Sequence, residues 1–119
     1  MPNLDAVFHD LRAILAPYAE VLDRKIDDAT QLYVDTKHIQ KSKKPLFFGA
    51  VQIKKSYVSY HLMPIYTKPE LLVGVSPELR ARMHGKSCFN FTGPEKTLLE
   101  ELAALTKASY ENYKTQGFV

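Results

Sequence analysis

Four histidines and one cysteine are the side chains of this 119-residue chain best suited to metal binding or nucleophilic chemistry. They are His9, His38, His61, His84 and Cys88. No two histidines stand four residues apart and no Cys-x-x-Cys pair exists, although these spacings are typical of zinc sites. His61, His84 and Cys88 can still converge in a fold, and such a mixed set would suit zinc or iron(II). The spacing favours unrelated histidines, so we assign no metal ligand and no cofactor.

Cys88 with His61 would also form a nucleophile and its general base. A reactive thiolate needs a nearby cation that lowers its pKa, and Lys86 or Arg82 can supply one. Cysteine is equally a small residue that is often buried in a core. The sequence therefore leaves both interpretations open.

Gly85-Lys86-Ser87 is similar to the end of a phosphate-binding loop, but the context does not fit. Such a loop needs a glycine five residues before the Gly-Lys pair, where this chain has Arg80. The loop should also connect a strand to a following helix, whereas this segment leads from a helix into a strand. We interpret Gly85 as the end of a helical segment.

Polar and aromatic side chains gather on one face of two expected strands. In 57–63, Val58, Tyr60 and Leu62 point one way, and the alternate residues point the other way. In 86–91, Phe89 and Phe91 likewise share one face, and Cys88 and Asn90 share the other. The candidate ligand-binding residues are Tyr33, Tyr57, Ser59, His61, Lys86, Cys88 and Asn90. Aromatic rings suit a planar ligand and nearby lysines suit an anionic group, although strand aromatics can also belong to the core.

These residues are positioned by the longest apolar and aromatic stretch, 45–66. Its residues 45–64 predict a β-hairpin that turns at Lys54, Lys55 and Ser56. In its first strand the alternation groups Phe47 with Gly49, Val51 and Ile53, and Phe48 with Leu46, Ala50 and Gln52. Because both groups are largely apolar, we expect a central strand that is covered on both faces.

The rest of the chain predicts helices at both ends of this hairpin. The expected elements are a helix over 3–18, irregular chain over 19–29, a strand over 30–36, a basic loop over 37–44, helical segments over 67–73 and 76–85, a strand over 86–91, and a helix from 92–94 to about 116. The order α-β-β-β-α-α-β-α indicates an α+β fold, with a small, mostly antiparallel sheet of about four strands packed by the N- and C-terminal helices.

Four local signals define the ends of these helices. Asn3 suits the N-cap of the first helix, and Pro17 should end or bend that helix. Thr67 and Glu70 have the spacing of a capping box. Gly117 suits the C-terminal cap of the last helix.

Composition predicts one globular domain over 1–119, with 45% hydrophobic residues and a net charge of +3. That charge is too small to imply nucleic-acid binding. One cysteine allows no intrachain disulfide, the start MPNLDAVFHDLR does not look like a signal peptide, and no apolar run is long enough for a membrane helix. We therefore expect a soluble cytoplasmic protein with no membrane partner.

The segments KKPLFFGAVQIKKSYVSYHLMPIY and GKSCFNF, followed by a terminal helix, resemble the YdhG-like domains, a bacterial family of uncharacterised function. The resemblance covers about 4–113. Many members carry a Tyr-Gly-Met-Pro-like segment where this chain has QLYVDTKHI, so that segment transfers no site. Some members have been likened to frataxin-type iron chaperones, which implies iron handling; the first helix offers only Asp5 and Asp10 as carboxylates, and no metal residue is transferred.

Our leading hypothesis is a small binding domain without enzymatic activity, which takes a small ligand or a protein partner on the polar and aromatic face. The alternatives are an iron-handling protein and a small enzyme that uses Cys88 and His61. Pairing of an exposed edge strand between copies of the chain is a further alternative.

Overall fold

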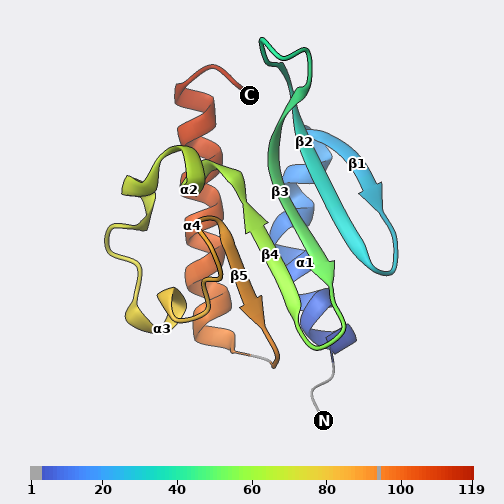
Figure 1. Ribbon diagram of the computed structural model, residues 1–119, viewed down its shortest axis with the longest axis vertical. Coiled ribbons are helices and arrows are strands. Elements are labelled where there is room, and N and C mark those ends of the chain that lie inside the picture. Colours follow the sequence, from blue (N-terminus) through green and yellow to red (C-terminus); the bar gives the residue numbers. More distant parts are fainter. Residues whose placement is uncertain (1–3, 94) are drawn as a thin grey trace.

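Five antiparallel strands form one sheet in the computed structural model, which describes residues 4–93 and 95–119 (Figure 1). Their order in the sheet is their order in the chain: β1 (Asp23–Asp27), β2 (Gln31–Ile39), β3 (Pro45–Ile53), β4 (Val58–Leu62) and β5 (Cys88–Phe91). The predicted α+β class and the mostly antiparallel sheet are confirmed. The expected number of about four strands is wrong by one.

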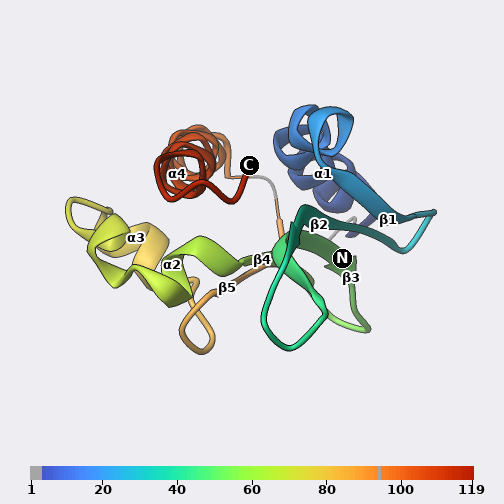
Figure 2. The ribbon, with the colours of Figure 1, turned by 90° about the horizontal axis from the view of Figure 1, so that it is seen from above.

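The two long helices, α1 (Leu4–Val21) and α4 (Lys96–Thr115), lie side by side on the same face of the sheet (Figure 2). The short α2 (Met63–Thr67), the 3-10 helix η1 (Pro69–Leu72) and α3 (Pro77–Arg80) form the connection from β4 to β5. The fold thus has two layers, with helices on one face of the sheet and neither long helix on the other. Among the described residues, no helix is long and apolar enough to cross a membrane.

The core lies between the helices and the sheet. The buried residues of α1 recur every three or four positions, which makes one apolar stripe: Val7, Phe8, Leu11, Leu15 and Ala19. They pack with the alternate residues of β4 and β5, namely Val58, Tyr60, Leu62, Phe89 and Phe91, all of which have 0% exposure. Burying a large apolar side chain contributes about 1.5–3 kcal/mol, so this layer dominates stability. The predicted alternation of both strands is confirmed.

A β-bulge in β3 reverses one of the predicted faces. Val34 pairs with Gly49 and Asp35 pairs with Phe47, so Phe48 is an extra residue between two paired positions. Phe48 is buried on the helix side, where its ring centroid lies 5.6 Å from that of Tyr18. The predicted grouping of Phe47 with Gly49 is therefore wrong, because the bulge shifts the alternation by one residue.

Phe47 instead lies on the face away from the helices, where its ring contacts those of Tyr33 and His61. β3 is a central strand, as predicted, with β2 and β4 as its neighbours. The expected cover on both faces is wrong, because α1 and α4 share one face (Figure 2).

Two segments expected to be irregular contain strand. Residues 23–27 form β1 because they pair with β2, although four of the five are exposed and four of the five are ionic, which hides any alternation. β2 also continues to Ile39, so the basic loop is shorter than predicted. Its tip is held by a hydrogen bond from the N–H of Gln40 to the carbonyl of Lys44, at 2.9 Å.

Helix α1 continues through Pro17 to Val21, so the predicted stop at Pro17 is wrong. The expected N-cap Asn3 lies outside the described residues. At the other end of the chain, Gly117 adopts a φ of +82°, and the N–H of Phe118 bonds to the carbonyl of Tyr113 at 2.9 Å. This confirms the predicted glycine cap of α4. The start expected at 92–94 is too early, because α4 begins at Lys96; Pro94 is not among the described residues.

The connection from β4 to β5 differs from its predicted form. The hydroxyl of Thr67 donates to the carbonyl of Pro64 at 3.1 Å, so the expected capping box with Glu70 is absent there. Helix α2 starts earlier than predicted because Pro64 stands in its first turn, a favoured position for proline. Ser76 caps α3, where its hydroxyl accepts from the N–H of Leu79 at 3.2 Å, but α3 ends at Arg80 rather than near Gly85.

Neither edge of the sheet is a long, regular strand with all of its backbone groups free. Along the outer side of β5, the N–H of Asn90 donates to the carbonyl of Arg82, and the N–H of His84 donates to that of Cys88. An isolated bridge joins Met83 to Phe89 between them. At the opposite edge, β1 has only five residues and contains a bulge.

Candidate functional site

The sheet face opposite the helices is the best candidate for a functional surface, and Figure 1 looks onto it. Eight partly buried residues make up this face, which we call the open sheet face: Gln31, Tyr33, Phe47, Gln52, Ser59, His61, Cys88 and Asn90. The strand register arranges most of them in two rows across β2, β3, β4 and β5. One row is Gln31, Gln52, Ser59 and Asn90, and the next is Tyr33, Ala50, His61 and Cys88.

The first row consists of uncharged polar side chains. The amide nitrogen of Gln52 donates to the side-chain oxygen of Gln31 at 3.0 Å, which orients both groups. Ser59 lies between Gln52 and Asn90 in the register. Hydroxyl and amide groups offer both donors and acceptors, so this row can form hydrogen bonds of either sense with a partner.

The second row supports a group of three rings. Ala50 stands between Tyr33 and His61, and Phe47 contacts both of their rings. The Tyr33 and Phe47 rings are stacked with centroids 4.7 Å apart, and His61 meets Phe47 edge-on at 4.8 Å. Because Ala50 has a single methyl group and only 2% exposure, the Phe47 ring occupies the space above it. The bulge in β3 thus creates an aromatic group that strict alternation of strand residues does not predict.

His61 is held by a residue that the sequence did not suggest. Its Nε2 atom lies 2.7 Å from the hydroxyl oxygen of Ser87, which is 7% exposed. Ser87 stands one residue before β5, and the N–H of Leu62 donates to its carbonyl, which fixes it beside β4. A serine paired with a histidine can be a nucleophile and its base. Here the hydroxyl is buried, so the contact orients the imidazole.

The hydrogen bond to Ser87 also bears on the proposed pairing of Cys88 with His61. Cys88 is the register neighbour of His61, but Nε2 is already engaged by Ser87. In the described part of the chain, no three histidine, cysteine or carboxylate side chains converge to hold a metal ion. His38 stacks near Phe118 and His84 lies on the loop before β5, so neither joins His61.

Burial lowers the pKa of His61 below its ordinary value of 6.5. In the unfolded chain the imidazole binds a proton more readily, so its contribution to stability is complete above about pH 7 and is lost as the pH falls toward 5. We expect the free energy of unfolding to decrease over this range, and His61→Gln to remove that part of the decrease. Urea titrations at several pH values measure it.

The matched control for this prediction is His9→Gln, because His9 is exposed on α1. Its pH dependence should follow that of the wild type. An imidazole of His61 that titrates above pH 6.5 by NMR would contradict the predicted sign.

Five of the seven residues predicted from the sequence lie on the open sheet face: Tyr33, Ser59, His61, Cys88 and Asn90. Tyr57 instead precedes β4 in a tight turn, where its carbonyl accepts from the N–H of Lys54 at 2.8 Å. Lys86 precedes β5, and its ammonium lies 6.0 Å from the ring centroid of Tyr66. The residues that were not among the candidates are Gln31, Phe47, Gln52 and Ser87.

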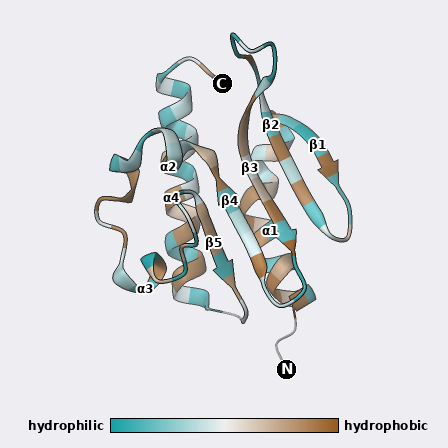
Figure 3. Cartoon of the chain, in the orientation of Figure 1, coloured by the Kyte–Doolittle hydropathy of each residue, from teal (hydrophilic) through white to brown (hydrophobic). Residues whose placement is uncertain are grey.

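Lysines stand at both ends of the open sheet face. Lys54 and Lys55 lie in the turn from β3 to β4, and Lys41, Lys43 and Lys44 lie near the tip of the hairpin from β2 to β3. Figure 3 shows these two hydrophilic ends with the more apolar strands between them. The face thus has cationic ends, and one buried carboxylate, that of Asp35, lies beside its aromatic centre as the register partner of Phe47.

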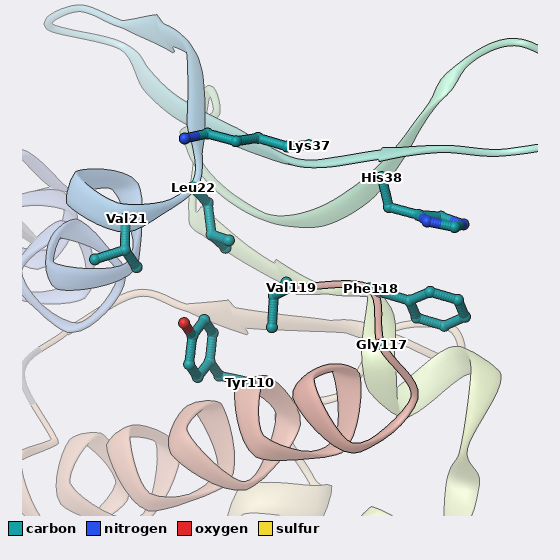
Figure 4. Close-up of a pocket in the computed structure, with 8 residues that line it drawn as sticks. All are labelled: Val21, Leu22, Lys37, His38, Tyr110, Gly117, Phe118 and Val119. Carbon is teal, nitrogen blue, oxygen red and sulfur yellow. The ribbon is translucent and has the colours of Figure 1, made fainter.

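Three cavities lie elsewhere on the molecule, and none of the three is lined by a residue of the open sheet face. The first, of about 320 Å³, lies where the ends of α1 and α4 approach β2, with Leu22, His38 and Tyr110 among its walls (Figure 4). The second, of about 560 Å³, lies beside α2 and η1. The third, of about 680 Å³, lies between α3 and α4.

Glu101 joins the elements at this third cavity. Its carboxylate accepts from the N–H and the hydroxyl of Ser76, at 2.7 and 2.6 Å. Arg82 also forms an ion pair with Glu95. These contacts attach the connection between β4 and β5 to α4.

No family model, no curated protein and no solved structure shows a significant match to this chain. The chemistry of the open sheet face therefore has to be inferred from the residues themselves.

Proposed function

We propose that this domain is a protein-interaction module that binds its partner through the open sheet face. One observation carries the proposal: both long helices lie on one face of the sheet (Figure 2), while the other face carries three contacting rings and a row of polar groups. Aromatic surface that the chain's own helices leave uncovered is typical of an interaction site.

The distribution of charge favours a protein over a small planar ligand. The eight residues of the open sheet face carry no lysine, arginine, aspartate or glutamate, and burial lowers the pKa of His61, which favours its neutral form at pH 7. One carboxylate, that of the buried Asp35, shares this side of the sheet as the register partner of Phe47, and burial raises its pKa. Interface centres are depleted in charged residues and enriched in aromatic ones, while the rim is polar. A small ligand needs a concave site, and the three described cavities lie away from the rings.

The rim predicts the chemistry of the partner. Lysines at both ends of the face would attract a protein that has carboxylates around an uncharged, partly aromatic patch. Two copies of this chain placed face to face would instead bring cationic ends together in either orientation. We therefore propose that the partner is a different protein of the cytoplasm, with acidic residues around its binding patch.

The alternatives have less support from the site. A Cys88 and His61 enzyme would require a contact between the thiol and the imidazole, whereas the hydrogen-bond partner of Nε2 of His61 is the hydroxyl of Ser87. Iron handling would require a group of oxygen ligands, whereas no three histidine, cysteine or carboxylate side chains converge among the described residues. Membership of the YdhG-like family stays a prediction.

The test uses a face variant and a matched control. Tyr33→Lys with Gln52→Lys places two charges within the open sheet face, whereas Ala104→Lys with Ala108→Lys places two on the exposed side of α4. A protein that the wild type captures from an extract of the source organism should also bind the control variant. The face variant should bind the purified partner at least about tenfold more weakly, since central interface residues dominate affinity.

Equal binding of every captured protein to both variants would refute the proposal. Light scattering tests whether the partner is a second copy of this chain. A wild-type dimer that becomes a monomer in the face variant would show this and would refute the proposal of an acidic-rimmed partner. Circular dichroism verifies that both variants are folded.

A further inference from the structure

A second site, separate from the open sheet face, lies beside the connection from β4 to β5. This is the cavity of about 560 Å³, whose walls come from two segments far apart in the chain. Ile65, Tyr66, Pro69 and Leu72 come from α2 and η1, and Met83, Gly85 and Lys86 come from the loop before β5. A volume of this size falls within the range of small-molecule sites, about 300–1,000 Å³.

Local sequence explains why these segments leave a space. Pro64 and Pro69 stand at the starts of α2 and η1, and both helices are short, so the chain bends away from β4 without forming a long packed helix. Gly85 has a φ of +88°, which lets the chain reverse on the other side of the cavity. The short bridge from Met83 to Phe89 holds that side against the sheet.

The lining is apolar except for one charge. Ile65, at 1% exposure, is part of the core, whereas Tyr66 is 54% exposed beside the cavity. Met83 and Leu72 are half-buried and pack against the core from its edge. Such a lining offers burial to an apolar group of a ligand.

Lys86 supplies the one cationic group of this lining. Its ammonium lies 6.0 Å from the Tyr66 ring centroid, and none of the ion pairs among the described residues involves it. The cavity between α3 and α4 differs, because Glu78, Glu95 and Glu101 line it together with Arg82. A cation without a carboxylate partner at the rim of an apolar cavity favours an anionic ligand.

We infer that this cavity binds a small amphipathic carboxylate, with its apolar chain against Leu72 and Met83 and its carboxylate at Lys86. The site is independent of the proposed protein-interaction face, because the two share no residue. Binding here would order Tyr66 and Lys86 at the surface.

Isothermal titration with octanoate and 1-octanol tests the inference. The wild-type protein should bind octanoate at one site per chain. Lys86→Gln should weaken octanoate binding about tenfold, as expected for the loss of one charge-assisted contact, and should leave 1-octanol unchanged. Leu72→Trp should fill the cavity and abolish binding of both compounds.

The controls are Lys68→Gln, at an exposed lysine that does not line the cavity, and Leu71→Trp, at the half-buried neighbour of Leu72. Both should retain octanoate binding, as should the face variant Tyr33→Lys with Gln52→Lys. The inference is overturned if octanoate does not bind below about 1 mM, if Leu72→Trp leaves its affinity intact, or if Lys86→Gln weakens 1-octanol as much as octanoate. Circular dichroism of each variant separates loss of binding from loss of fold.

Discussion

Phe48→Ala is expected to lower the free energy of unfolding by about 3–5 kcal/mol, the usual cost of removing a fully buried phenylalanine ring. Phe48 has 0% exposure and meets the rings of Tyr18, Tyr110 and Tyr113, so the truncation opens a cavity between the sheet and both long helices. Since domains of this size are stable by about 5–15 kcal/mol, the loss would be a large part of the total. Urea unfolding measures it.

The neighbouring Phe47→Ala is the matched control, because it removes the same ring from the open sheet face. Phe47 is only half-buried, so we expect a loss of about 1–2 kcal/mol. Phe47→Ala also disrupts the aromatic group, so it should weaken partner binding. Folded Phe48→Ala protein should bind the partner as the wild type does. A larger stability loss for Phe47→Ala than for Phe48→Ala would show that the bulge is placed wrongly.

Thr106→Val is expected to cost about 1–3 kcal/mol, because it leaves a buried hydroxyl of Tyr60 without a partner. The Thr106 hydroxyl donates to the carbonyl of Leu102 at 2.8 Å, so in its 2.7 Å contact with Tyr60 it accepts the phenolic proton. Both residues have 0% exposure, so water cannot replace the lost acceptor. The shape of the side chain is conserved, which limits the effect to the hydrogen bond.

A double-mutant cycle tests this assignment of donor and acceptor. Tyr60→Phe removes the donor while Thr106 keeps its bond to Leu102, so it should cost only about 0.5–1.5 kcal/mol. The double variant should lose less stability than the sum of the single variants, because no hydroxyl is then left unpaired. Strict additivity of the two losses would contradict a direct Tyr60–Thr106 hydrogen bond.

The sequence predicted the parts of the sheet where alternation is regular. In β4 and β5 successive residues alternate between the two faces of the sheet, so the buried Tyr60 and Phe89 and the outward His61 and Asn90 follow from the pattern. Ser87 could not be assigned in this way, because it stands before β5, which begins at Cys88 rather than at the predicted residue 86. The hydrogen bond of its hydroxyl to His61 depends on tertiary structure.

Two other differences between the prediction and the structure have local causes that the alternation of residues in the sequence does not show. Adjacent phenylalanines at 47 and 48 fit either face, so only the pairing with β2 shows which one is the extra residue. β1 has exposed side chains on both of its faces, and its strand conformation comes from pairing rather than from burial. The sequence therefore suggested most of the open sheet face but not the aromatic group at its centre.

The backbone hydrogen bonds along the outer side of β5 have a consequence for how any protein can be recognised. Residues 82–84 already use the groups through which an added strand would extend the sheet there. At the other edge, β1 is short, bulged and rich in charge, features that discourage strand addition. Recognition by β-augmentation is thus disfavoured at both margins. A partner must lie across the strands and read side chains, so its specificity would depend on surface shape rather than on main-chain complementarity.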